Sequence, residues 1–379
     1  MRYFRSQAAL VCALALSGTA IPVAAVKPVA KEATGQIPIT SSSAEAKQLY
    51  LKGRDLSEKQ RVTDARALFE QAVAKDPTFA LGHLGLANTA STNKEFFDAL
   101  EKAKSLSGKV SKAERLMIEG LDAGARGQLE RQKACYTKLT NMFPSDERTH
   151  NLLGSYHFGR QDWPSAIAAY ERAIAIAPSF SQPYNQMGYA YRFLGRYAEA
   201  EKAFQAYIRL IPDDPNPYDS YAELLMKMGR FQDSIRNYEK ALSLDPNFVA
   251  SYAGIGNNRI FMGQGDEARE SFAKLYKQAR NDGERRFALF WVAMSYVHEG
   301  QTEKALAEVA KMAKMAEATG DLSTLAGDYN QMGDILLEAD QPDAAAAQFA
   351  EQLKAIDKAK VPAEVKQAAH RNALYDDVR

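Results

Sequence analysis

A repeat of 34 residues is the feature that most restricts how this sequence can fold. Proline recurs at that interval at Pro144, Pro178, Pro212 and Pro246. Aromatic residues keep the same interval at Tyr136, Tyr170, Phe204, Tyr238 and Phe272, and glycine keeps it at Gly195, Gly229 and Gly263. Because several residue types hold one register, the sequence predicts stacked copies of one unit. Neighbouring copies then supply the core that a single unit cannot bury.

Residues 181–214 show what one unit is. The apolar residues of its first half have the spacing of one helix face, at Tyr184, Met187, Gly188 and Tyr191. Those of its second half also have helical spacing, at Ala200, Ala203, Phe204 and Tyr207. Gly195 between them suits the left-handed residue after a helix, and Pro212 ends the second helix. Each unit is therefore predicted to be a helical hairpin.

Small residues recur where the two helices of a unit should cross. Gly188 is matched by Ala200 twelve positions later, and five other units repeat such a pair: Gly154 and Ala166, Ala222 and Ser234, Gly256 and Ala268, Ala293 and Ala305, Gly333 and Ala345. Antiparallel helices approach closely only where neither carries a bulky side chain at the contact. The fixed spacing therefore predicts one recurring helix crossing.

With these motifs the sequence resembles the tetratricopeptide repeat (TPR) family. The resemblance covers residues 44–282, is most specific over 113–282, and continues in divergent form over 283–359. It implies an all-α fold, a right-handed superhelical solenoid of about nine hairpins. Residues 360–379 are expected to form a C-terminal capping helix and tail. The repeats after residue 282 lack the terminal proline, so we expect their helices to be longer or to pack differently.

The first 25 residues have the composition of a secretory signal peptide. Two arginines precede a short apolar run, Ala8–Leu16, and small residues follow as far as Ala25. We expect cleavage after Ala25, export to the periplasm or out of the cell, and a mature chain without a transmembrane segment. Residues 26–43 contain proline, glycine and a run of serines, and are expected to be a flexible linker.

The sequence contains two cysteines, Cys12 and Cys135. Cleavage of the signal peptide would leave Cys135 without a partner for an internal disulfide. We interpret Cys135 as a packed small residue, with a reactive thiol or an intermolecular bridge as the alternative.

The TPR resemblance also indicates where a partner binds, because the first helices of this family line a concave groove. The residues at groove positions that we select are Arg148, Asn151, Ser155, Asn185, Tyr189, Arg192, Asp219, Glu223 and Asn257. Asn151, Asn185 and Asp219 occupy one position of three successive repeats. An asparagine amide can both donate to and accept from a peptide backbone, so this ladder could hold an extended peptide. The alternative is that these are ordinary solvated side chains.

Other kinds of function find little support in the sequence. There is no phosphate-binding loop, dinucleotide fingerprint, cysteine–histidine cluster or catalytic constellation, so we predict no catalytic residue, metal or cofactor. Lys and Arg total 48 against 47 Asp and Glu, which argues against a nucleic-acid partner. We therefore predict a non-enzymatic scaffold or adaptor of the cell envelope that binds a protein or extended peptide. A self-associating structural component is the alternative, the oligomeric state stays open, and an enzyme is much less favoured.

Overall fold

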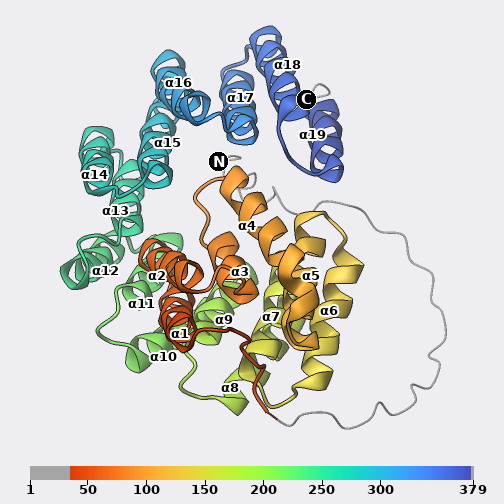
Figure 1. Cartoon of the computed structure of the whole chain (residues 1–379). Helices are drawn as coiled ribbons and strands as arrows, with labels where there is room; N and C mark the ends of the chain where they lie inside the picture. Colours follow the sequence, from red (N-terminus) through yellow and green to blue (C-terminus); the bar gives the residue numbers. More distant parts are fainter. Residues whose placement is uncertain (1–34, 377–379) are drawn as a thin grey trace, which may run out of the picture.

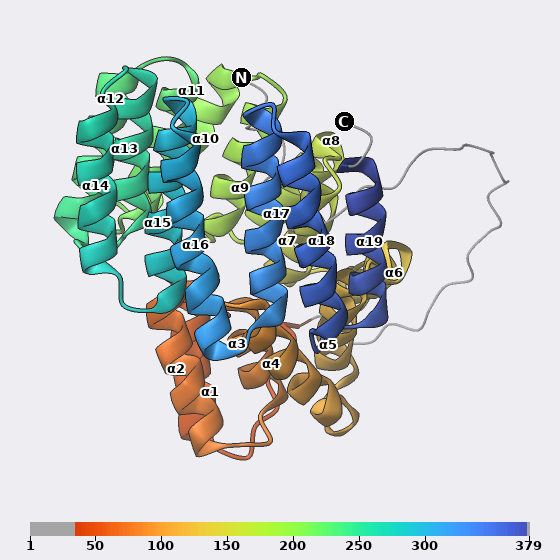
Figure 2. The same ribbon diagram turned by 90° about the horizontal axis from the view of Figure 1, so that it is seen from above.

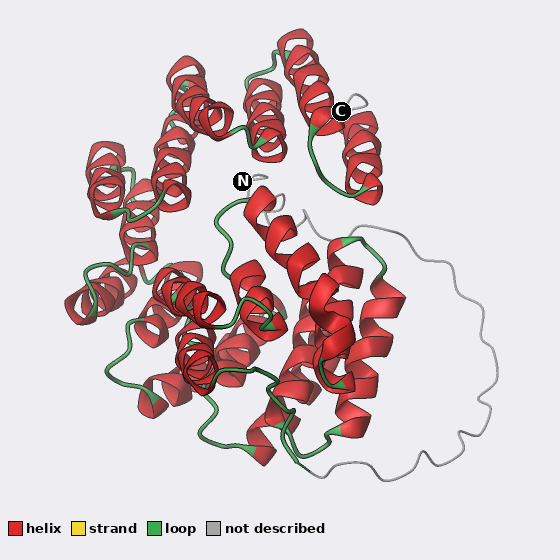
Figure 3. Ribbon diagram, viewed as in Figure 1, coloured by secondary structure: helices red, strands yellow, loops and turns green. Residues whose placement is uncertain are grey.

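The computed structural model describes residues 35–376, and within that range the chain is helical without a strand (Figure 3). The α-helices follow one another as nine hairpins and a final helix, and a short 3₁₀ helix, Ser107–Lys109, lies between the second and third hairpins. The hairpins are α1 (Ala44–Glu58) with α2 (Val62–Lys75), α3 (Ala80–Asn88) with α4 (Asn93–Leu106), α5 (Lys112–Ala125) with α6 (Leu129–Met142), α7 (Glu147–Gly159) with α8 (Trp163–Ile176), α9 (Gln182–Phe193) with α10 (Tyr197–Leu210), α11 (Asn216–Lys227) with α12 (Phe231–Leu244), α13 (Ala250–Phe261) with α14 (Gly265–Gln278), α15 (Asp282–His298) with α16 (Thr302–Thr319), and α17 (Leu322–Glu338) with α18 (Pro342–Lys358).

These hairpins stack along a curved path, as Figures 1 and 2 show from two directions. Each helix packs against the next one in the chain, and the hydrophobic clusters are likewise distributed along the stack. The predicted all-α solenoid of helical hairpins is thereby confirmed. The predicted signal peptide, residues 1–25, lies outside the described residues.

The turn inside each central hairpin has a left-handed residue, as the repeated glycine predicted. Gly195, Gly229 and Gly263 have φ angles of 72°, 74° and 77°. Gln161 takes the same place between α7 and α8 with a φ of 59°. A side chain at such an angle costs about 1–2 kcal/mol, so glycine is the residue that fits this turn best.

The helix crossing is close because glycine faces an aromatic ring. A Cβ atom added at Gly188 would lie 2.7 Å from the Phe204 ring, and one at Gly154 would lie 2.5 Å from the Tyr170 ring. Ala200 and Ala166, the small partners selected from the sequence, are fully buried. The small residues therefore lie at the helix crossing as predicted. The atoms that leave room only for glycine, however, belong to the aromatic ring four positions after the alanine, for example Phe204 after Ala200.

The helices after residue 282 are longer than those of the central repeats. α15 has 17 residues and α16 has 18, whereas α13 has 12 and α14 has 14. The sequence predicted that helices in repeats without the terminal proline would be longer or would pack differently, and the structure has the longer helices. α19 (Ala363–Asp376) packs against α18, and its Ala369 contacts a cluster that includes Ala355 and Ile356.

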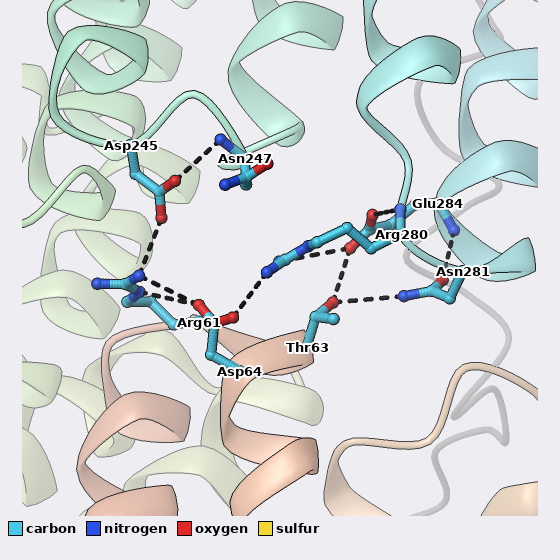
Figure 4. A network of polar contacts seen from close by, with 8 residues as sticks. All are labelled: Arg61, Thr63, Asp64, Asp245, Asn247, Arg280, Asn281 and Glu284. Carbon is cyan, nitrogen blue, oxygen red and sulfur yellow. Dashed lines mark hydrogen bonds and ion pairs between the residues drawn. The ribbon is translucent and has the colours of Figure 1, made fainter.

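The curved stack brings its first hairpin back against later repeats. Figure 4 shows the polar contacts that join the start of α2 to the loops before α13 and α15. Arg61 pairs with Asp245 at 3.0 Å, and Asp64 pairs with Arg280 at 2.6 Å. The Thr63 hydroxyl donates to Glu284 at 2.6 Å. We call this set of contacts the closure network.

An extended segment, residues 35–43, runs along the first repeats before α1 begins. The Ile37 N–H donates to Asp146 at 2.7 Å, and the Thr40 N–H donates to Glu114 at 2.7 Å. The Ser42 N–H donates to Asp76 at 2.8 Å. These residues belong to the stretch that was expected to be a flexible linker. That expectation is wrong for residues 35–43, because buried carboxylates hold the segment through its backbone.

Candidate functional site

The predicted groove residues lie on α7, α9, α11 and α13, which contact one another in sequence order. Asn151, Asn185, Asp219 and Asn257 are buried. Arg148, Tyr189, Arg192 and Glu223 are half-buried, and Ser155 is exposed. The first helices of four consecutive repeats thus present one continuous face. We call this face the groove.

Three asparagines of the groove have side-chain oxygens without a donor. The Asn151 Nδ2 atom donates to Gln182 at 2.8 Å, which links α7 to α9. The Oδ1 atoms of Asn151, Asn185 and Asn257 are buried and accept no hydrogen bond from the described residues. A buried oxygen without a donor costs about 1–3 kcal/mol. These oxygens therefore favour a ligand or water molecule that supplies donors.

Asp219 continues the ladder beyond Asn151 and Asn185 with a carboxyl group. The Ser251 hydroxyl donates to its Oδ1 atom at 2.6 Å. Burial raises the pKa of Asp219 to about 7, and repulsion from Glu223 adds to this, while the bond from Ser251 opposes it. Asp219 is therefore a buried carboxyl that changes its charge near neutral pH.

Arg192, Glu223 and Tyr189 form one assembly between α9 and α11. The Arg192 guanidinium pairs with Glu223 at 2.9 Å. It also lies 4.7 Å from the centre of the Tyr189 ring and 5.0 Å from that of Phe193. Burial raises the pKa of Tyr189 well above its usual value, so this residue stays neutral. The structure thus brings together three residues that the repeat register had selected separately.

Arg148 is engaged by the first hairpin. Glu58, at the end of α1, accepts from the Arg148 Nε and Nη2 atoms at 2.7 and 3.0 Å. Arg148 also pairs with Glu147 and lies over the Phe180 ring at 4.9 Å. Arg148 is thus the predicted groove residue whose positive charge is neutralised by a residue of the first hairpin, Glu58.

The turn between α1 and α2 also reaches the groove. The Lys59 carbonyl oxygen accepts from the Asn216 Nδ2 atom at 3.2 Å. Next to it, Gln60 has a left-handed φ of 62°. A cavity of about 440 Å³ lies between this turn and the groove, and we call it the Asp219 cavity. Its walls are formed by Gln60, Phe158, Asn185, Gln186, Tyr189, Phe193, Asn216, Asp219, Glu223, Phe248 and Ala250.

Gln60 is the wall residue that lies farthest in the sequence from the predicted groove residues, and sequence reasoning missed it. It lies in the first hairpin, and no local pattern marks its return to α9 and α11. The curvature of the whole stack brings it there, and that curvature is the sum of small rotations between repeats.

Histidine and cysteine side chains, which could bind a metal or act as nucleophiles, have structural contacts in the repeats. The His150 Nε2 atom lies 3.0 Å from the Pro144 carbonyl oxygen, and His157 pairs with Asp162. Cys135 is buried, and burial raises the pKa of its thiol. Within residues 35–376 there is no group of three or more His, Cys, Asp or Glu side chains placed to hold a metal ion. Over the same range, no helix is both long and apolar enough to span a membrane.

Sequence profiles described as tetratricopeptide repeat match four segments of the chain, residues 50–107, 119–179, 169–202 and 215–248. The chain contains tetratricopeptide repeats. The hairpin architecture of these TPRs continues beyond residue 248 as far as α18. No curated protein sequence matches the chain.

The solved structures that resemble the chain do so at low sequence identity. MamA is 23% identical, with 42% of this chain and 93% of MamA covered and a TM-score of 0.36. YrrB, described as a TPR protein with an unusual peptide-binding site, is 21% identical, with 47% of this chain and 91% of YrrB covered and a TM-score of 0.32. A TPR protein from Parabacteroides merdae is 16% identical, with 76% of this chain and all of that protein covered and a TM-score of 0.45.

Proposed function

We propose that this TPR array is a non-enzymatic protein-interaction scaffold that binds an extended peptide in its groove. The observation that carries the proposal is the set of buried Oδ1 atoms of Asn151, Asn185 and Asn257, which receive no hydrogen bond from residues 35–376. An extended peptide has a backbone N–H at nearly every residue. Its N–H groups would satisfy these oxygens without requiring a particular side-chain sequence.

The chain's own extended segment supports this mode of binding. The Glu114 carboxylate, on the first helix of its repeat, accepts from the Thr40 N–H and hydroxyl at 2.7 Å each. Glu114 precedes Arg148 by one period of 34 residues, so it occupies a groove position. A side chain at a groove position, that of Glu114, therefore already holds extended backbone.

The proposed location of the scaffold is the cell envelope, the periplasm or the outside of the cell. It rests on the signal-peptide composition of residues 1–25, with the predicted cleavage after Ala25. Mass spectrometry of the mature N-terminus tests this location. A cytosolic protein that retains its first residues would contradict it.

Selection from a random dodecamer display library on the immobilised full chain tests the peptide function. Enriched peptides are synthesised and their affinities measured by calorimetry. We expect the double variant Asn151→Ala/Asn185→Ala to lose roughly tenfold in affinity, since two hydrogen bonds contribute about 1–3 kcal/mol. Gln367→Ala, an exposed amide on α19, is the matched control and should bind normally. Unchanged affinity in the double variant would contradict the proposal.

A further inference from the structure

We propose that the Asp219 cavity is a cation subsite that receives the lysine or arginine side chain of a bound peptide. This inference rests on the proposed function and deepens it, because it names the chemistry of the partner. The volume of the Asp219 cavity, about 440 Å³, lies within the range of about 300–1,000 Å³ that is typical of ligand pockets.

The charge of Asp219 is not balanced by a cation. Asp219 is 7% exposed, and within residues 35–371 it takes part in no ion pair. On its own helix it faces Glu223, which has the same charge. Two cations lie in this region: the Arg192 guanidinium on α9, which is paired with Glu223, and Lys227 on α11, which interacts with Arg192 and Glu223. The remaining titratable groups nearby are the neutral hydroxyls of Tyr189 on α9 and Tyr238 on α12. A buried carboxylate of this kind favours a partner that brings a positive charge.

Asn185 gives an independent indication that a donor is missing. It lies in the same cavity, is 3% exposed, and its Oδ1 atom accepts no hydrogen bond from the described residues. A lysine ammonium carries three N–H donors and an arginine guanidinium carries five. Either group could donate to Asn185 and neutralise Asp219 in one binding event.

The aromatic walls favour a cation over an anion or an apolar group. Phe158 lines the cavity beside Phe193. Because the Phe193 ring already carries Arg192 at 5.0 Å and stacks on Trp163, Phe158 is the one of these two rings left to meet a ligand. Aromatic faces attract ammonium and guanidinium groups through their negative electrostatic potential. A carboxylate would be repelled by the unpaired charge of Asp219. An alkyl group would leave the Asn185 oxygen without a donor.

A small probe tests the subsite without any peptide. Saturation-transfer NMR measures binding of n-butylammonium to the full chain, with 1-butanol as the uncharged control. We expect n-butylammonium to bind in preference to butanol, and Asp219→Asn to remove at least three-quarters of its signal. Asp343→Asn, an exposed aspartate on α18, should leave the signal unchanged. Equal signals from both variants and the wild type, or no binding to the wild type, would overturn the inference.

The wild-type protein provides a second test that needs no variant. The alkylammonium stays charged between pH 6 and 8, while the ionised fraction of Asp219 rises because its pKa is about 7. We expect affinity for n-butylammonium to rise roughly tenfold over this range. A flat pH profile would count against Asp219 as the binding group.

The peptide selection separates this inference from the function on which it rests. A basic residue should recur at one position of the enriched peptides, and replacing it by norleucine should cost roughly tenfold in affinity. Enriched peptides without such a residue would overturn the subsite and leave the scaffold function standing. Binding of n-butylammonium without any enriched peptide would instead contradict the scaffold function.

Discussion

Asp76 and Asp219 are both buried aspartates of the repeat array, and they differ in what surrounds them. Asp76 accepts hydrogen bonds from Ser41, Ser42 and Thr78, all supplied by the chain itself. Although burial acts in the opposite direction, these bonds hold the pKa of Asp76 well below its usual value. Asp219 receives one bond from Ser251, and burial raises its pKa to about 7.

This contrast extends to two regions of the repeat array. In the first repeats the extended segment 35–43 supplies donors to Glu114, Asp146 and Asp76. In the central repeats the oxygens of Asn151, Asn185 and Asn257 have none from the described residues. One architecture therefore has an occupied region and a region whose acceptors lack donors. The second is the region to which we assign peptide binding.

The largest effect is expected from removing the charge of Asp219. Because its folded pKa is raised above the unfolded value, Asp219 lowers stability progressively as pH rises from about 4 to 7. Asp219→Asn should therefore raise the free energy of unfolding by about 2–4 kcal/mol at pH 8 and by much less at pH 4.5. Urea unfolding at both pH values measures this. A gain that does not depend on pH would refute the proposed ionisation.

The next largest effect is expected at Glu114 in the occupied region. Its carboxylate is fully buried, holds Thr40, and accepts from the Ser111 N–H at 2.9 Å in a helix-capping box. Glu114→Ala should lower the free energy of unfolding by about 2–3 kcal/mol, since it removes a cap and leaves buried donors unpaired. Glu351→Ala on α18, whose side chain is 46% exposed, serves as control and should change the free energy of unfolding by less than about 0.5 kcal/mol.

A smaller effect, opposite in sign to that of Asp219, is expected at Asp76. Its folded pKa is depressed, so its stabilising contribution is present above the unfolded pKa of about 4 and is lost as pH falls through the folded pKa. Asp76→Asn should lower the free energy of unfolding by about 1–2 kcal/mol at pH 7. This difference between the variant and the wild type should shrink as the pH falls below 4. If the difference in stability between the variant and the wild type instead increased in acid, Asp76 and Asp219 would not have opposite pH dependences.

The smallest effect is expected in the closure network. Arg280→Ala removes the pair with Asp64 and should cost about 0.5–1 kcal/mol, because both side chains are partly exposed. Hydrogen exchange of residues 58–64 should become roughly two- to fivefold faster, and high salt should reduce the difference from wild type. Arg285→Ala is the matched control, since Arg285 pairs within α15 with Asp282. Equal exchange in both variants would show that the network does not hold the first hairpin.

The fold was predictable from the sequence because its determinants are local and repeated. Gly195 marks a turn, Pro212 ends a helix, and Gly188 leaves room for the Phe204 ring within one hairpin. Each signal lies within 34 residues of its partner and recurs, so the register could be read directly.

The contacts of the first hairpin with the groove could not be predicted in this way. Glu58 reaches Arg148 across 90 positions, and Lys59 reaches Asn216 across 157. Such contacts depend on the curvature of the whole stack, which no single repeat encodes. The linker composition of residues 35–43 was misleading for a related reason: the carboxylates that hold the segment lie up to 109 positions away.

The closure network also has a mechanical consequence. In a stack of helical hairpins most contacts join neighbouring repeats, so the stack can extend like a coil as small rotations between repeats add up. Arg61 and Asp64 tie the beginning of this coil to the loops before α13 and α15, so pulling on the ends must first break ion pairs. The coil should therefore be stiff at low force and yield abruptly once those pairs separate.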